Sequence, residues 1–168
     1  MRAGIAFGSN VGDRLANLRA ARERVRRIAG VTEPIISSRI YETEPVNSTP
    51  GAGAYLNAVI EVEYDGQPIA LLDALQAIET ELGRPSKRPR NAPRTIDLDI
   101  LYAGNLVLSN QDVVIPHPRL HQRRFVLAPL ADIRPELVLP GQQRSVAELL
   151  AALHDPAAVR ILPETWDA

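Results

Sequence analysis

Two aspartates separated by a single residue, Asp97 and Asp99, are the side chains whose type and spacing most directly suggest chemistry. The apolar segment around them predicts a strand, so both carboxylates leave the same face, with Cα atoms about 6.5–7 Å apart. Carboxylates this close repel each other unless a proton or cation lies between them. Oxygen ligands without histidine or cysteine favour magnesium or calcium, and magnesium usually adds water and phosphate to one or two carboxylates. The pair predicts a magnesium site; ion pairs with arginines on a solvated sheet face are the alternative.

Two basic stretches flank this pair. Residues 84–94 contain five cations and no acid, and residues 117–124 contain three arginines and two histidines, again without an acid. Lys87 is the only lysine of the chain, so the cationic side chains are almost all guanidinium groups, which suit bidentate contacts with phosphate. The stretches predict a phosphate clamp around the carboxylates, and an ordinary solvated surface is the alternative.

Hydrophobic periodicity predicts the elements that must position these residues. We expect strands over 2–7, 35–43, 55–64 and 95–102, a helix from Asp13 to Gly30, a helix from Pro68 to Gly83, and a helix over 119–131. A turn at Gly104 with a short return strand follows the fourth strand, and Ser145 and Glu148 have the spacing of a capping box. Residues 46–54 and the proline-rich 84–94 are predicted loops. The order β-α-β-β-α-β predicts an α+β, ferredoxin-like sandwich with helices on one face of an antiparallel sheet and additions at the C-terminus.

Composition limits the class of protein. The 168 residues suit one domain, residues 1–168, and 45% hydrophobic with 23% charged residues is typical of a globular protein. The net charge of -1 argues against a general polyanion binder, and no apolar run is long enough to span a bilayer. There is no cysteine and no secretory signal, so we expect a cytoplasmic protein without disulfides.

The text around the aspartates, Ala92-Pro93-Arg94-Thr95-Ile96-Asp97-Leu98-Asp99-Ile100-Leu101, carries a specific resemblance. Five further blocks are found in the same order: Gly8-Ser9-Asn10; Tyr41-Glu42-Thr43-Glu44-Pro45; Tyr55-Leu56-Asn57-Ala58; Ile78-Glu79 leading to Gly83-Arg84; and Pro116-His117 followed by Arg123-Arg124-Phe125-Val126-Leu127. Together they cover nearly the whole chain and closely resemble the 6-hydroxymethyl-7,8-dihydropterin pyrophosphokinases of folate biosynthesis.

The resemblance implies a transferase that moves the pyrophosphoryl group of ATP to the hydroxymethyl oxygen of the pterin and releases AMP. It implies that Asp97 and Asp99 hold two Mg²⁺ ions and that Arg84 and Arg94 act on the transferring group. ATP contacts are implied for Gln76, Glu79, Arg84, Arg94, Ile100, His117 and Arg123, and pterin contacts for Thr43, Pro45, Val46, Tyr55, Asn57 and Phe125. The partners would be small molecules only, without nucleic acid or membrane, and the chain would act as a monomer.

Several of these residues also have simpler explanations. Tyr55 and Asn57 share a strand face, as a stacking and an edge-reading side chain should, but they also fit a half-buried tyrosine and a strand-edge asparagine. Phe125 fits a helix core, and His117 fits a capped loop histidine. The chain departs from the family at Ser86, Asn91, Ala92, Asp112 and Val114, which leaves open how the basic loop closes and how the nucleotide is held.

Two other functions use similar features. A ferredoxin-like sheet beside a basic loop suits an RNA-binding module, but such sheets stack bases on aromatic residues, and only 4% of this chain is aromatic. A metal-dependent phosphohydrolase also uses paired aspartates and would release inorganic phosphate from ATP without pterin.

Overall fold

The computed structural model describes residues 1–43, 53–83, 95–154 and 158–167. The strands are β1 (Arg2–Ser9), β2 (Val31–Ser37), β3 (Tyr41–Thr43), β4 (Tyr55–Tyr64), β5 (Asp97–Ala103), β6 (Leu108–Ser109), β7 (Val114–Ile115) and β8 (Val159–Ile161). The helices are α1 (Arg14–Arg26), α2 (Pro68–Glu81), the 3-10 turn η1 (Leu120–Gln122), α3 (Arg124–Ile133) and α4 (Val146–Ala152).

The main sheet is antiparallel and has the order β5-β1-β4-β3-β8, with β2 also paired to β4. Strands β2 and β3 follow each other along the same edge of β4, so together they form the second strand of a β-α-β-β-α-β unit. The predicted ferredoxin-like, α+β fold is confirmed.

The predicted strand over 35–43 is wrong in its extent. The chain leaves the sheet between β2 and β3, where Ser38 replaces the regular ladder: its N–H donates to the Val59 carbonyl, and its hydroxyl accepts from the Val59 N–H, both at 2.9 Å. Helix α1 likewise ends at Arg26, before Gly30, whose φ of 93° belongs to the turn into β2. The short return strand β6 pairs with β7 and not with β5, because the chain turns away from the sheet after Gly104.

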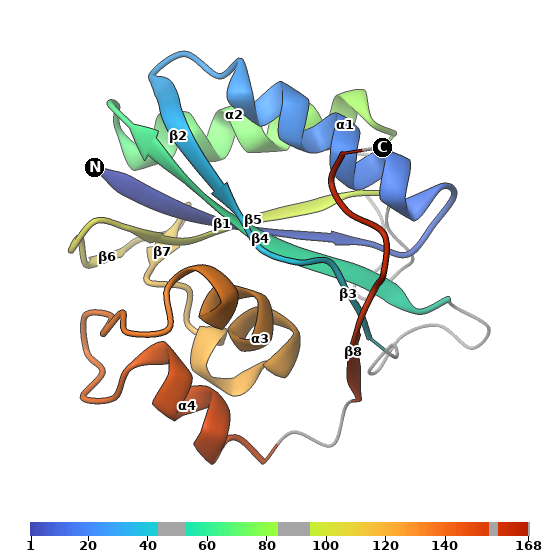
Figure 1. Ribbon diagram of the computed structural model, residues 1–168. Coiled ribbons are helices and arrows are strands. Elements are labelled where there is room, and N and C mark those ends of the chain that lie inside the picture. Colours follow the sequence, from blue (N-terminus) through green and yellow to red (C-terminus); the bar gives the residue numbers. More distant parts are fainter. Residues whose placement is uncertain (44–52, 84–94, 155–157, 168) are drawn as a thin grey trace.

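Helices cover both faces of the sheet, which corrects the predicted one-faced sandwich (Figure 1). Helices α1 and α2 lie on one face over a core that includes Phe7, Leu18 and Leu75, while the C-terminal α3 and α4 lie on the other over Val59 and Leu127. The sequence predicted a helix over 119–131 but not which face of the sheet it would contact. The additions at the C-terminus therefore provide the second layer.

Two carboxylates fix the C-terminal end of α3 to the sheet. Asp132 accepts from the Arg39 guanidinium at 2.8 and 3.1 Å and from the Tyr41 hydroxyl at 2.9 Å. Glu61, whose side chain is only 4% exposed, accepts from Arg134 at 2.5–3.1 Å and from the Tyr102 hydroxyl at 2.6 Å. Burial of such a carboxylate is tolerable because its oxygens are bonded to a cation and a hydroxyl.

The C-terminal segment packs against the core on the α1 face of the sheet. Trp166 is buried, packs edge-on against Phe7 with ring centres 5.5 Å apart, and donates from Nε1 to the Ser38 carbonyl at 2.7 Å. Strand β8 pairs with β3, so this segment also holds the outer side of β3. Among the described residues, no helix is both long and apolar enough to cross a membrane.

The contacts of Glu61 predict that part of the free energy of unfolding is lost at acid pH. Burial raises the pKa of Glu61, but hydrogen bonds from Arg134 and Tyr102 and the charge of Arg134 outweigh burial, so the pKa lies below its usual value of 4.5. As the pH falls, the Glu61 carboxylate is therefore protonated in the unfolded chain before it is protonated in the folded protein. The stabilisation that it contributes is present above pH 4.5 and is lost progressively below that pH.

We expect Glu61→Gln to lower the free energy of unfolding by about 2 kcal/mol at pH 7, the size of charged hydrogen bonds. In thermal melts from pH 7 to pH 3.5 the difference from wild type should shrink as the pH falls. Glu63→Gln, on the same strand but with a side chain 36% exposed, is the control and should cost less than about 1 kcal/mol. A difference for Glu61→Gln that does not change with pH would contradict the assignment.

Candidate functional site

One cross-strand row brings the predicted site residues together. In β5, Asp97 pairs with Gly8 of β1, Gly8 pairs with Asn57 of β4, and Asn57 pairs with Tyr41 of β3. Directly paired residues of antiparallel strands point to the same face of a sheet. The next row, Asp99–Ala6–Val59, includes a residue of the core under α3, so the whole group lies on the α3 face.

Asp97 and Asp99 both point to this face and are partly exposed, while Leu98 and Ile100 between and after them are buried in the core on the α1 face. Among the described residues no group of three or more histidine, cysteine, aspartate or glutamate side chains could hold a metal ion. A pair of carboxylates without further protein ligands fits Mg²⁺, which usually keeps water and substrate phosphate in its shell. It does not fit zinc, which requires three or four protein ligands.

The asparagine of the row has a fixed orientation. The Thr43 hydroxyl donates to Asn57 Oδ1 at 2.8 Å, and both side chains are buried. Because Oδ1 is an acceptor in this bond, Nδ2 is the end of the amide that faces Gly8, where a Cβ atom would lie 3.3 Å from it. The amide can therefore present a donor to a ring bound beside it.

Two half-buried aromatic rings lie on the same face of the sheet. Tyr55 lies two residues before Asn57 on the same face of β4, and its Cδ1 would lie 3.7 Å from a Cβ atom at Gly8. Phe125 lies in the first turn of α3, packs against the core of this face, and has the Arg123 guanidinium 5.4 Å from its ring centre. The arrangement suits a flat ring bound near the start of α3.

The importance of Gly8 was missed by reading residue types alone. A Cβ atom there would meet Asn57, Tyr55 and, at 4.0 Å, Asp97 Cβ. Gly8 thus lies between the asparagine and Asp97, and a side chain there would crowd both. The glycine was visible in the sequence, but its neighbours are known only from the register of three strands.

His117 lies beside β5. The backbone N–H of His117 donates to the Leu101 carbonyl at 2.8 Å. The ring Nδ1 of His117 accepts from the backbone N–H of Arg119 at 3.2 Å. Burial, followed by the charges of Arg123 and Arg119, lowers the His117 pKa, and the charge of Asp97 acts in the opposite direction. The neutral ring must carry its proton on Nε2, since Nδ1 is an acceptor. It can therefore donate one hydrogen bond towards an anion.

The side chains of three predicted ATP contacts are not on the face of the sheet to which the carboxylates point. The buried Glu79 of α2 accepts from the Leu98 N–H at 2.8 Å, so it supports the outer edge of β5. The Ile100 side chain is buried in the core. Ile100 lies two residues after Leu98, so its backbone N–H and C=O point in the same direction as those of Leu98, towards the outer edge of β5. Gln76 is exposed on the same helix as Glu79.

Four predicted site residues, Arg84, Arg94, Pro45 and Val46, lie outside the described residues, as do the family departures Ser86, Asn91 and Ala92. The departures Asp112 and Val114 are exposed at the β6–β7 turn. There the Asn110 side chain accepts from the Asp112 N–H at 2.8 Å and closes the turn.

Comparisons with known proteins show the family of the chain. Residues 4–135 match the family described as 7,8-dihydro-6-hydroxymethylpterin-pyrophosphokinase (HPPK). The 2-amino-4-hydroxy-6-hydroxymethyldihydropteridine pyrophosphokinase of Haemophilus influenzae is 37% identical over 159 residues, 95% of this chain and 97% of that protein. The enzyme of the same name from Bacillus subtilis is 45% identical over 129 residues, 77% of this chain and 75% of that one.

Solved structures show the same fold. A crystal structure of an HPPK-DHPS in complex with substrates has a TM-score of 0.73 at 15% identity and matches 89% of this chain. The wild-type Plasmodium falciparum HPPK-DHPS with pterin and p-hydroxybenzoate has a TM-score of 0.69 at 16% identity. This chain spans 44% and 42% of those chains. With its sequence matched across residues 4–135 and its relatives aligned over most of their length, the chain belongs to the 7,8-dihydro-6-hydroxymethylpterin-pyrophosphokinase family.

Proposed function

We propose that this chain carries out the reaction of its family, transfer of a pyrophosphoryl group from ATP to the hydroxymethyl group of 6-hydroxymethyl-7,8-dihydropterin, on the α3 face of the sheet. The observation that carries the proposal is the row Asp97–Gly8–Asn57. It puts a carboxylate that suits magnesium and a buried amide on either side of a glycine. A nucleotide phosphate and a pterin hydroxyl bound by these side chains would meet above Gly8.

The nucleotide side of the site would be formed by β5 and its surroundings. Asp97 and Asp99 would hold two Mg²⁺ ions, and His117 and Arg123 would face the triphosphate with a neutral donor and a cation. The outward backbone of Ile100 suits hydrogen bonds to a base, with Glu79 bracing that edge and Gln76 nearby. Arg84 and Arg94 would contact the phosphates, and this assignment rests on the sequence alone.

The pterin side would be formed by β3, β4 and the start of α3. Tyr55 and Phe125 would enclose the ring, and Asn57, held by Thr43, would read its edge. This assignment is supported by the bond between Thr43 and Asn57, which fixes the amide before any ligand binds. Pro45 and Val46 would complete the pocket, again from the sequence alone.

The reaction asks mainly for positioning and charge stabilisation. The hydroxymethyl oxygen attacks the β-phosphorus in line, the bond from that phosphorus to the bridging α-oxygen breaks, and AMP leaves. Bound magnesium would neutralise the phosphate oxygens. The Nε2–H of His117 and the Arg123 guanidinium would stabilise negative charge on the triphosphate, and the Asn57 amide would orient the hydroxyl that attacks.

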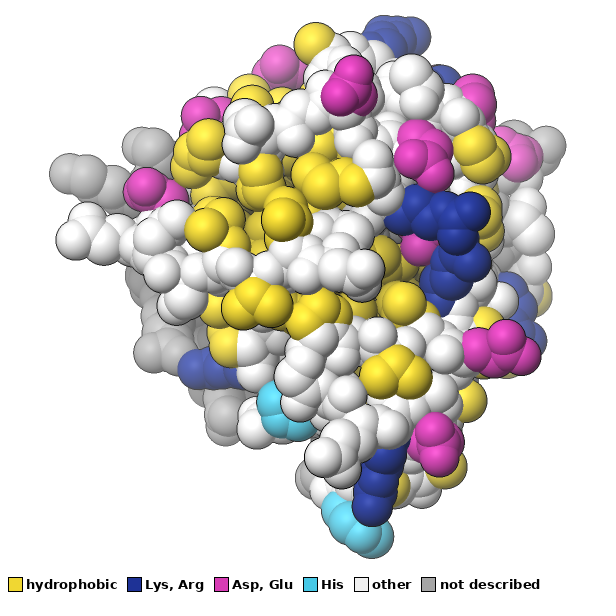
Figure 2. Space-filling model, turned by 90° about the vertical axis from the view of Figure 1, so that its left-hand side faces the viewer, with side chains coloured by type: hydrophobic (Ala, Val, Ile, Leu, Met, Phe, Trp, Pro, Cys, Tyr) yellow, Lys and Arg dark blue, Asp and Glu magenta, His cyan; other side chains and the backbone are white. Residues whose placement is uncertain are grey.

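The RNA-binding alternative is not supported. RNA recognition on such folds uses an open sheet face with aromatic residues, whereas α1 and α2 cover one face here and α3 and α4 cover the other. The side of the molecule near the N-terminus, seen in Figure 2, shows interspersed acidic and basic side chains around hydrophobic ones and no basic stripe. The phosphohydrolase alternative lacks a relative among these comparisons and does not explain the locked Asn57.

We also infer a single domain that acts as a cytoplasmic monomer. The main sheet contains strands from both ends of the chain, from β1 to β8, which supports one domain. The absence of cysteine suits a reducing compartment. At one edge of the sheet β8 has only three residues, and at the other edge Glu79 covers the Leu98 N–H of β5, which limits pairing with another chain.

The identity of the nucleotide product tests the reaction class. With purified protein, ATP, magnesium and the reduced hydroxymethyl pterin, we expect one AMP for each pterin diphosphate formed, measured by chromatography. A pterin that lacks the hydroxyl should bind and give no AMP, because it has no nucleophile. Pterin-dependent ADP would refute the pyrophosphokinase assignment, and phosphate release without pterin would favour a hydrolase.

Removal of a carboxylate tests the metal site. Asp97→Asn and Asp99→Asn should each lower the rate of AMP formation by about 100-fold or more at every magnesium concentration, because a charge stabiliser of the transferring group is lost. Thermal melting should remain close to wild type, since both side chains are partly exposed. Asp65→Asn, which is exposed in the turn between β4 and α2, is the control and should leave the rate unchanged. A near-normal rate for either variant at saturating magnesium would show that the metal is bound elsewhere.

The position of Gly8 between Asn57 and Asp97 gives a third test. The methyl group of Gly8→Ala would occupy the space between Asn57 and Asp97 and should lower kcat by roughly ten- to hundredfold through misplaced substrates. Gly4→Ala, on the same strand, would meet the Tyr102 ring at 2.3 Å and should instead lower the melting temperature. Equal kinetics for Gly8→Ala and wild type would mean that the substrates do not meet above this residue.

A further inference from the structure

The guanidinium of Arg14, the first residue of α1, joins two strands from the other side of the sheet. Its Nη1 lies 2.7 Å from Glu42 Oε2 in β3 and donates to the Ala54 carbonyl at 2.9 Å, directly before β4. The base of the side chain is held in place because Asp13 caps the helix by accepting from the Ala16 N–H at 3.0 Å. The Arg14 guanidinium therefore binds β3 through Glu42 and the start of β4 through the Ala54 carbonyl.

The two bonded groups are each one residue from a proposed pterin contact. Glu42 precedes Thr43, Ala54 precedes Tyr55, and Thr43 and Tyr55 are direct cross-strand partners. Arg14 thus fixes the backbones that carry the donor to Asn57 and one of the two aromatic rings. A change in the separation of Glu42 and Ala54 would move both.

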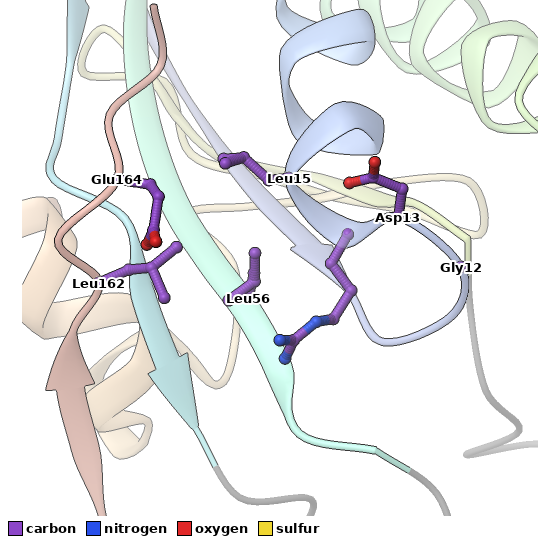
Figure 3. Close-up of a pocket in the computed structure, with 7 residues that line it drawn as sticks. Gly12, Asp13, Leu15, Leu56, Leu162 and Glu164 are labelled. Atoms are coloured by element: carbon purple, nitrogen blue, oxygen red, sulfur yellow. The ribbon is translucent and has the colours of Figure 1, made fainter. Parts of the chain in front are cut away.

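Arg14 lies on the face of the sheet opposite the proposed site. It lines an open hollow of about 340 Å³ together with Leu15, Leu56, Leu162 and Glu164 (Figure 3). Leu56 points into the core on the α1 face, whereas its neighbours Tyr55 and Asn57 point to the α3 face. The sheet therefore separates Arg14 from the proposed site.

We infer that Arg14 is a positioning residue for the pterin: by binding Glu42 and the Ala54 carbonyl together, it sets the spacing of Thr43 and Tyr55 across the strands. This inference rests on the proposed pterin site. The bond to Glu42 is partly sheltered, with the Arg14 and Glu42 side chains 31% and 12% exposed. Hydrogen bonds to charged groups in such places are stronger than those of surface ion pairs.

The chain offers a matched control. Arg160 of β8 also forms an ion pair with Glu42, from the outer side, but its side chain is 77% exposed. The backbone carbonyl of Ala54, in contrast, accepts a hydrogen bond from Arg14. Arg14→Met and Arg160→Met each remove one cation from Glu42 and keep the apolar stem, but only Arg14→Met removes the bond to Ala54.

The test compares Michaelis constants for the two substrates. Arg14→Met should raise the KM for pterin about tenfold, the effect of losing one charged hydrogen bond, and leave the KM for ATP within about twofold. Arg160→Met should leave both within about twofold. Glu42→Gln, a milder change at the same bond, should move the pterin KM in the same direction. Melting temperatures are measured alongside.

An unchanged pterin KM in Arg14→Met, or equal increases for both substrates with a lowered melting temperature, would overturn the inference. Asn57→Ala separates this failure from failure of the proposed site. If Asn57→Ala raises the pterin KM and Arg14→Met does not, the role of Arg14 alone is wrong. If Asn57→Ala leaves that KM unchanged, the proposed pterin site is wrong and the role of Arg14 falls with it.

Discussion

The register of β1 between β4 and β5 is the constraint on which the site depends. Hydrogen bonds on both sides fix Gly8 opposite Asn57 and Asp97 at once. A shift of either neighbour by one residue would turn its side chains to the other face and separate the amide from the carboxylates. The core on each side of the sheet opposes such a shift, because Phe7 and Leu98 would leave one apolar layer and the polar row would enter it.

Helix α3 contributes Phe125 to the proposed site from its N-terminal end, while its C-terminal end is bonded to the sheet. Its C-terminus is fixed through Asp132 and the neighbouring Arg134, whereas Phe125 lies in its first turn. A rigid helix transmits this anchoring along its axis, so a ring at the open end keeps its distance from β4. On the other face Arg14 performs the corresponding task for the strands. The two faces of the sheet thus contribute differently: one holds the groups that we propose to contact substrates, and the other holds the strands that carry them.

Much of this arrangement could be predicted from local pattern. Alternation gave β4 its exact bounds, and the same period put Asp97 and Asp99 on one face. The bond between Thr43 and Asn57, the support of Leu98 by Glu79 and the contact of Arg14 with Ala54 could not be predicted, because each depends on which strands become neighbours. The break at Ser38 was hidden for the same reason, since its partner is Val59 in another strand. An arginine in the first turn of a helix resembles any solvated cation until its acceptors are known.

The outward edge of β5 has a consequence for the behaviour of the protein in solution. An outer strand presents backbone groups to which a strand from another molecule can bind. Glu79 occupies the N–H of Leu98 and His117 binds the carbonyl of Leu101, so the stretch around Ile100 lies between two covered positions. A base bound there would shield the same stretch from intermolecular pairing. Catalytic occupancy and resistance to aggregation would then share one segment of backbone, and the nucleotide-free protein would be the more aggregation-prone form.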